Sequence, residues 1–262
     1  MSGVVDDLRG AQLKDASFWA FFEIALGGGV QEDTIAMLEE AARGGDARAG
    51  GITLRSILAE ALAAGGQGSR DGGRTRASLL RRGAKLAFRD LNDVERAFHW
   101  LGDALIAHVD DATLDELEAL GHEINHVQRV EQTIGRALEE VFDGPLVRKL
   151  LHRRAKLRRD VIGDKKGAAI DLKKLHDLSP ADQEVMNDLS NLLMSLGDHR
   201  GMIQLYEDQI LRGRDPSQRA ELARKVARLW EEEIGDAREA ADAWRRVLRM
   251  KAADPEATTG LE

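Results

Sequence analysis

Residues 218–256 form a pair of amphipathic helical segments, and this pair limits the possible folds of the chain more than any other stretch. Apolar residues recur every three or four positions on both sides of the turn Gly235-Asp236, the pattern of helices with one buried face. The first segment carries Leu222, Val226, Leu229 and Trp230, and the second carries Ala237, Ala240, Ala241, Trp244, Val247 and Leu248. One hairpin of this size cannot bury both apolar faces, so the chain must supply further hairpins that pack against it.

Those further hairpins are indicated by turns that recur at 34–38 residues between about 75 and 256. The predicted turns are Asn92-Asp93, Gln128-Arg129, Gly163-Asp164, Gly197-Asp198 and Gly235-Asp236. Residue identity gives an independent indication, because LLRRGAKL at 79–86 and LLHRRAKL at 150–157 agree at six of eight positions, two periods apart. The region is therefore predicted to hold five repeated units.

In these repeated units the chain resembles the tetratricopeptide repeat (TPR) family. The residues at the family's spacing are Leu117, Leu120, Gly121, Ile124, Ala137 and Pro145 in one unit, and Gly235, Asp236, Ala240, Trp244, Asp254 and Pro255 in the last. The resemblance implies an all-α helical-hairpin solenoid, a TPR-like superhelix of about five units with an N-terminal helical cap or small bundle. It also implies that the first helix of each unit lines a concave surface that binds peptides.

By that resemblance, ten residues of two units are expected to face the groove and contact a partner. They are Asp115, Glu118, His122, Asn125, His126, Glu184, Asn187, Asn191, Met194 and Ser195. Asn187 and Asn191 are one helical turn apart, and their side-chain amides both donate and accept hydrogen bonds. They are therefore suited to bind the backbone of a second chain. The alternative is a solvated helix face without a ligand.

Three regions are predicted along the chain: an N-terminal helical segment at 1–64, a Gly-rich linker at 65–73 and the repeat array at 74–258. The segments 30–45 and 51–66 each follow a helical pattern that ends in glycine. We expect no strand of any length.

A dense cluster of large apolar residues lies at 18–26, with Phe18, Trp19, Phe21 and Phe22 close together. Such a cluster must be buried against something. We expect it to pack on the N-terminal helices, and the alternative is a docking surface that supports homo-oligomers.

The sequence His122-Glu123-Ile124-Asn125-His126 has the H-E-x-x-H pattern of zinc hydrolases. On one continuous helix this spacing places both imidazoles on the same face, where they bind Zn²⁺ while Glu123 acts as general base. No third ligand stands out in the sequence. The pattern gives an alternative function, a zinc-dependent hydrolase with His122 and His126 as ligands.

Charge is sorted along the array, because residues 110–143 are rich in acids and residues 148–174 are rich in bases. The two blocks either face each other in adjacent repeats or stay solvated. Otherwise the basic patch receives an acidic partner or RNA, a second alternative function. The residues of this patch are Arg153, Arg154, Lys156, Arg158, Arg159, Lys165 and Lys166.

The charge, the cysteine content and the apolar runs of the chain argue against several classes of function. The formal net charge of −8 makes a nucleic-acid partner unlikely, and the absence of cysteine excludes disulfides and thiolate metal sites. No apolar run is long enough for a membrane span and no secretion signal is recognisable, so we expect a cytoplasmic protein. High arginine relative to lysine favours a bacterial source. The sequence predicts a non-enzymatic scaffold or adaptor that needs no cofactor and binds another protein or peptide.

Overall fold

The computed structural model describes residues 30–43, 48–49, 52–67, 70–71 and 73–262. The chain divides into two compact units, Met1–Leu150 and Leu151–Glu262. The N-terminal unit contains α3 (Glu32–Arg43), β1 (Arg48–Ala49), β2 (Ile52–Thr53), α4 (Leu54–Ala64), α5 (Arg74–Arg89), α6 (Val94–Ala107), α7 (Asp111–Glu123), α8 (Val127–Glu140) and the start of α9 (Gly144–Leu157). The C-terminal unit contains the rest of α9, then η1 (Arg158–Ile162), α10 (Lys165–Leu178), α11 (Gln183–Leu196), α12 (His199–Arg212), α13 (Pro216–Arg228), η2 (Leu229–Ile234), α14 (Ala237–Met250) and α15 (Pro255–Thr259).

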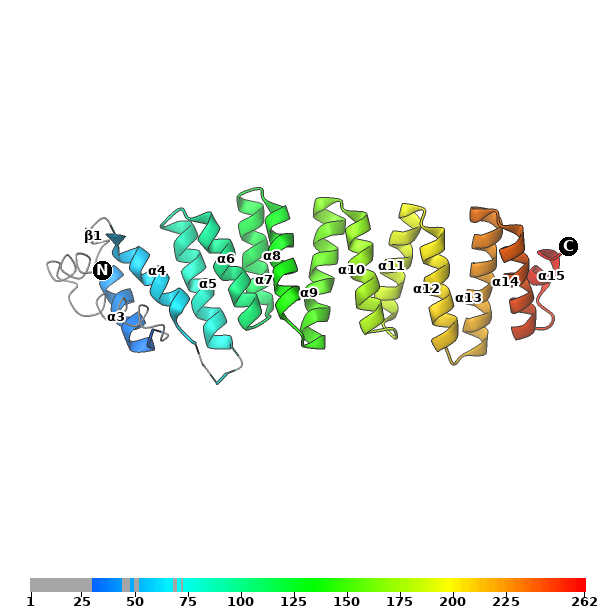
Figure 1. Cartoon of the computed structure of the whole chain (residues 1–262), viewed down its shortest axis with the longest axis horizontal. Helices are drawn as coiled ribbons and strands as arrows, with labels where there is room; N and C mark the ends of the chain where they lie inside the picture. The colour runs from blue at the N-terminus through cyan, green and yellow to red at the C-terminus, as the bar shows by residue number, and fades with distance from the viewer. Residues whose placement is uncertain (1–29, 44–47, 50–51, 68–69, 72) are drawn as a thin grey trace. The chain divides into compact units, whose positions relative to one another are not determined.

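Consecutive helices in each unit form antiparallel hairpins that stack side by side (Figure 1). In the N-terminal unit α6 packs against α5, α7 and α8, and in the C-terminal unit α13 packs against α12 and α14. The predicted all-α class of helical hairpins is confirmed. The described residues add one element that was not expected, an antiparallel ladder of two residues per strand between β1 and β2.

The hairpin turns have a common construction. Asn92, Gly163, Gly197 and Gly235 have positive φ angles of 53°, 80°, 66° and 75°, a region that glycine enters freely and asparagine more readily than most residues. Each is followed by an aspartate that caps the next helix, as Asp198 does by accepting the Gly201 amide at 2.9 Å. Four of the five predicted turns are therefore confirmed.

The remaining turn, predicted at Gln128-Arg129, is wrong by a few residues. The chain turns at Asn125, whose φ is 56°, so α7 ends at Glu123 and α8 begins at Val127. The amide of His126 donates to the carbonyl of Gly121 at 2.8 Å, and the amide of Asn125 donates to His122 at 3.2 Å. These two bonds form the Schellman arrangement that ends a helix at a left-handed residue.

The unequal length of the repeats has a structural cause. In the hairpins α9–α10 and α13–α14 the first helix ends in a π-helical turn, η1 after α9 and η2 after α13. A π turn accommodates additional residues without interrupting the helix. The longer spacings before Gly163 and Gly235 are thus taken up inside a helix, and the turn itself is unchanged.

The helices α3 and α4 stack on α5 and share a core with it. Leu38, Leu54 and Leu79 are buried in one cluster that draws on all three helices. Arg76 of α5 donates from Nη1 to the carbonyl of Gly65 at 2.7 Å. The division at 65–73 into a separate N-terminal segment and the array stays a prediction.

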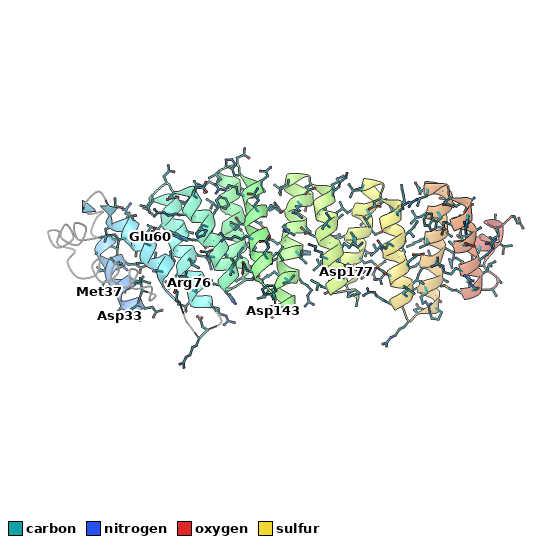
Figure 2. The ribbon with its side chains drawn as sticks, viewed as in Figure 1. Asp33, Met37, Glu60, Arg76, Asp143 and Asp177 are labelled. Atoms are coloured by element: carbon teal, nitrogen blue, oxygen red, sulfur yellow. The ribbon has the colours of Figure 1, made fainter. Side chains whose placement is uncertain are left out.

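Ion pairs in the N-terminal unit join equivalent helices of successive hairpins. Arg81 and Arg89 of α5 form bidentate pairs with Glu116 and Glu123 of α7, with N–O distances of 2.6–3.0 Å. The pair between Glu60 of α4 (labelled in Figure 2) and Arg96 of α6 has the same relation, at 2.7 Å. Exposed pairs add at most about 1 kcal/mol each, so they set the register between hairpins more than they stabilise them.

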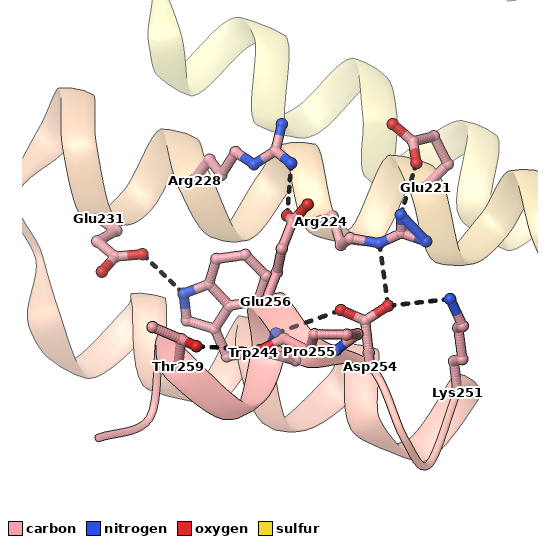
Figure 3. Close-up of polar contacts among 11 residues, drawn as sticks. Glu221, Arg224, Arg228, Glu231, Trp244, Lys251, Asp254, Pro255, Glu256 and Thr259 are labelled. Atoms are coloured by element: carbon pink, nitrogen blue, oxygen red, sulfur yellow. Dashed lines mark hydrogen bonds and ion pairs between the residues drawn. The ribbon is translucent and has the colours of Figure 1, made fainter.

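The C-terminal end of the array is organised by Asp254 (Figure 3). This carboxylate is 2 % exposed, accepts the Ala257 amide at 3.2 Å, and lies 3.3 Å from Arg224 Nε and 3.4 Å from Lys251 Nζ. Burial acts to raise its pKa, but the Ala257 amide and the two cations together hold the pKa below the ordinary value. The pair Asp254-Pro255 therefore begins the new helix α15 as cap and first residue, whereas α14 has already ended at Met250.

Candidate functional site

The ten predicted partner-binding residues fall into one group in each unit. In the N-terminal unit Asp115 and His122 are exposed on α7, Glu118 is half-buried there, and Asn125 and His126 are exposed in the turn after it. The structure thus brings this group together on one helix and its C-terminal turn.

The H-E-x-x-H pattern does not lie on one helix, which corrects the expectation for His122 and His126. His122 is in the last turn of α7, but His126 follows the left-handed Asn125 and precedes α8. The helical geometry that would align the two imidazoles is therefore absent. Glu123, the expected general base, binds Arg89 through both carboxylate oxygens at 2.6 Å. Among the residues that the structure describes, no group of three His, Asp or Glu side chains is arranged to hold a metal ion.

The second group forms an exposed ridge on α11. Its members Glu184, Asn187, Asn191, Met194 and Ser195 are all exposed, and Met194 is 60 % exposed although it is apolar. Two members make local hydrogen bonds: Gln183 donates to Asn187 Oδ1 at 3.2 Å, and Ser195 donates to the carbonyl of Leu192 at 2.9 Å. We refer to these five residues as the α11 ridge.

The predicted basic patch at 148–174 is partly engaged inside the C-terminal unit. Arg154 donates two hydrogen bonds to Asp171 at 2.6 and 2.9 Å, and Arg158 donates a third at 2.8 Å. Arg159 pairs with Asp160 at 2.7 Å and with Asp188 at 3.0 Å.

The other members of the patch have different surroundings. Lys156, Lys165 and Lys166 are exposed, and Arg153 is half-buried. In the N-terminal unit, Lys149 joins the basic block to Asp111 of the acid-rich block at 2.7 Å.

A groove of about 560 Å³ lies between α10 and α12, and no sequence pattern predicts it. Its apolar lining comes from Ala169, Ile170, Leu189, Leu193, Leu196 and Leu205, and its polar lining includes Lys166, Lys173, His176, Asp177, Arg200, Gln204 and Asp208. These residues come from three helices. The only sequence signal for the floor of the groove is the apolar spacing of α11. That spacing is equally typical of a helix that packs in the core.

His176 lies at one end of this groove and is 2 % exposed. Gln209 Nε2 donates both to His176 Nε2 at 3.1 Å and to the carbonyl of Pro180 at 3.1 Å. Burial lowers the pKa of His176; Arg212 adds to this effect, while Asp177, Asp208 and Asp182 oppose it. His176 is therefore neutral in the folded protein at neutral pH.

We expect acidification to destabilise the C-terminal unit through His176. Because the folded pKa is lowered, the unfolded chain binds a proton that the folded chain does not bind as the pH falls below about 6.5. Stability should therefore rise with pH through that window. His176→Gln, which keeps an acceptor for Gln209 but cannot titrate, should reduce this dependence. Thermal unfolding followed by circular dichroism between about pH 5 and about pH 7 measures it. Equal slopes for the variant and the parent would contradict the assignment.

Two further expectations concern the aromatic cluster at 18–26 and a membrane span. The cluster at 18–26 lies outside the described residues. Among the helices that are described, none combines the length and the apolar character needed to cross a bilayer.

The chain is similar to several solved structures of TPR proteins. YrrB, described as a TPR protein with an unusual peptide-binding site, is 15 % identical with a TM-score of 0.33, over 70 % of this chain and 90 % of that one. A TPR protein from Parabacteroides merdae is 14 % identical with a TM-score of 0.33, over 95 % and 96 %. The C-terminal part of a TPR repeat-containing protein from Cytophaga hutchinsonii is 12 % identical with a TM-score of 0.31, over 99 % and 92 %. No protein-family model and no curated protein sequence matches the chain. These similarities concern the fold alone.

Proposed function

We propose that this protein is a non-enzymatic scaffold or adaptor that binds a partner polypeptide on the α11 ridge. The observation that carries the proposal is the exposure of Asn187 and Asn191 one turn apart on the first helix of a hairpin, beside the exposed apolar Met194. Amide side chains at this spacing bind a backbone by donating to a carbonyl and accepting from an N–H group. Met194 supplies an adaptable apolar contact next to them.

The first helices α5 and α7 of the N-terminal unit differ from α11. Their exposed faces are occupied by the bidentate pairs of Arg81 with Glu116 and of Arg89 with Glu123. A partner at those positions would have to compete with charge-assisted hydrogen bonds. The group on α7 and its turn stays a second, weaker part of the proposed partner surface.

The two alternative functions are less well supported. A zinc hydrolase would need His122 and His126 on one helical face, and they lie on different elements. An acidic partner or RNA would need free guanidinium groups in the basic patch. Arg154, Arg158 and Arg159 are instead held by carboxylates of the same unit.

The double variant Asn187→Ala/Asn191→Ala tests the proposal. If each amide contributes one net hydrogen bond of about 0.5–1.5 kcal/mol, binding of the partner should weaken by about fivefold to about 150-fold. The measurement is quantitative recovery of partners from native lysate on the immobilised protein, read by mass spectrometry.

The matched control is Gln128→Ala/Gln132→Ala, which removes two exposed amides one turn apart on α8. Both double variants should retain the parent circular dichroism spectrum. If the asparagine variant and the glutamine variant recover the same partners in the same amounts, the α11 ridge is not the binding site.

A further inference from the structure

The groove between α10 and α12 has an exposed apolar side chain at its mouth, above a buried apolar floor. Ile170 is 57 % exposed although it lines the groove, whereas Leu189, Leu193 and Leu205 beneath it are buried. A half-exposed isoleucine at the mouth of an apolar groove can be buried by the apolar side chains of a bound partner.

The two helices that flank the groove run parallel and in register. Lys173 of α10 donates to Gln204 Oε1 of α12 at 3.3 Å near the middle, and His176 contacts Gln209 at 3.1 Å further along. Each flanking position on α10 thus meets a position about one repeat later on α12. Residues with the same place in the two helices therefore lie at the same end of the groove.

Because of this register, positive side chains gather at one end of the groove and negative side chains at the other. Lys166 and Arg200 lie near the helix N-termini, while Asp177 and Asp208 lie near the C-termini (Figure 2 labels Asp177). The remaining carboxylate at the N-terminal end, Asp198, is engaged as the cap of α12. Helix dipoles add to this polarity, because they make N-termini positive and C-termini negative.

The groove faces away from the α11 ridge. Residues two positions apart on a helix point about 200° apart, so Leu189 and Leu193 lie on the opposite side of α11 from Asn187 and Asn191. A ligand in the groove is therefore separate from a partner on the ridge.

We propose that this groove is a second docking site, which binds an amphipathic helix from a partner polypeptide. The bound helix places apolar side chains on Ile170, an acidic residue beside Lys166 and Arg200, and a basic residue beside Asp177 and Asp208. The distance along α10 from Lys166 to Asp177 is about 16 Å, or three turns of helix. A ligand helix of that length presents three or four apolar side chains to the groove at helical spacing. It displaces the Lys173–Gln204 bond, which is long and exposed.

The test uses three synthetic amphipathic peptides that share one leucine stripe. One carries glutamate at one end and lysine at the other, one carries lysine at both ends, and one carries glutamate at both ends. Fluorescence anisotropy should show that the parent protein binds the mixed peptide about tenfold more tightly than the other two. No saturable binding of the mixed peptide, or equal binding of all three, would overturn the proposal.

Two variants locate the binding. Ile170→Asp should weaken binding of the mixed peptide about tenfold or more without unfolding the protein, because the side chain is already 57 % exposed. Lys166→Glu/Arg200→Glu makes both ends of the groove acidic and should transfer the preference to the peptide with lysine at both ends. The same preference in parent and variant would place the peptide elsewhere and refute the site.

The control Asn187→Ala/Asn191→Ala should leave peptide binding in the groove unchanged. This control separates the two proposals: the groove site fails if the control variant loses the mixed peptide, whereas the ridge site is tested by native partners alone.

Discussion

Replacing Asp171 by alanine is expected to destabilise the C-terminal unit by about 3–5 kcal/mol. Asp171 is fully buried and accepts three hydrogen bonds, two from Arg154 and one from Arg158. The two guanidinium groups are themselves mostly buried, with side-chain exposures of 13 % and 18 %. Removing the carboxylate would take away the acceptor of both hydrogen bonds from the largely buried Arg154, and would leave that guanidinium close to a second cation. Urea unfolding followed by circular dichroism measures the loss.

The control is Asp160→Ala, which removes a carboxylate that pairs with Arg159 but is 42 % exposed. Because exposed pairs contribute little, this variant should lose less than about 1 kcal/mol. A triple replacement of Asp171, Arg154 and Arg158 by apolar residues of similar size should recover much of the stability. A loss of less than about 1 kcal/mol for Asp171→Ala would show that the cluster does not stabilise the fold.

Replacing Trp244 by alanine is expected to cost about 3–5 kcal/mol. The indole of Trp244 is 3 % exposed on α14, and its Nε1 donates to Glu231 Oε2 of η2 at 2.8 Å (Figure 3). Gly260 lies against the same ring, where a Cβ atom would overlap it. The substitution therefore leaves a large cavity between α14, η2 and the segment after α15. Because it also removes a fluorophore, unfolding should be followed by circular dichroism.

Two variants separate the contributions at Trp244. Trp244→Phe keeps most of the ring but loses the bond to Glu231, and should cost about 1–2 kcal/mol. Trp230→Ala is the matched control, because Trp230 is only half-buried and its ring lies 5.9 Å from the guanidinium of Arg200. Its loss should be clearly smaller than that of Trp244→Ala. Equal losses at the two tryptophans would mean that burial of Trp244 is not the stabilising factor.

The helices and most of the turns could be predicted because their causes are local in the sequence. A helix is stabilised by bonds between residues four apart, and its buried face shows in the spacing of residues such as Val226 and Val247. The turns at Gly163 and Gly197 combine a residue that tolerates positive φ with an aspartate cap. Both signals lie within a few neighbouring residues.

Two predictions made from neighbouring residues were wrong: the position of the turn near Asn125 and the placement of the H-E-x-x-H pattern on one helix. Asparagine occupies the left-handed position at Asn92 and again at Asn125, but the spacing of the turns predicts only the first. The motif predicted a continuous helix from five letters, but the Schellman bonds of Asn125 and His126 end α7 between the two histidines. Within a motif of this length, one residue able to adopt positive φ changes the predicted chemistry.

The residue pattern alone is enough to predict that this chain forms short amphipathic helices in hairpins that repeat and stack, since each hairpin has an apolar face that it cannot bury alone. Which charges meet and which remain available depends on how those helices pack. Arg154 and Asp171 are 17 residues apart, and α9 and α10 must pack before they can meet. The groove lined by Ile170 likewise forms from three helices, and no pattern of neighbouring residues in the sequence predicts that they meet. The physical reason is that helix formation depends on near neighbours, whereas pairing and cavities depend on how side chains from distant segments fit together.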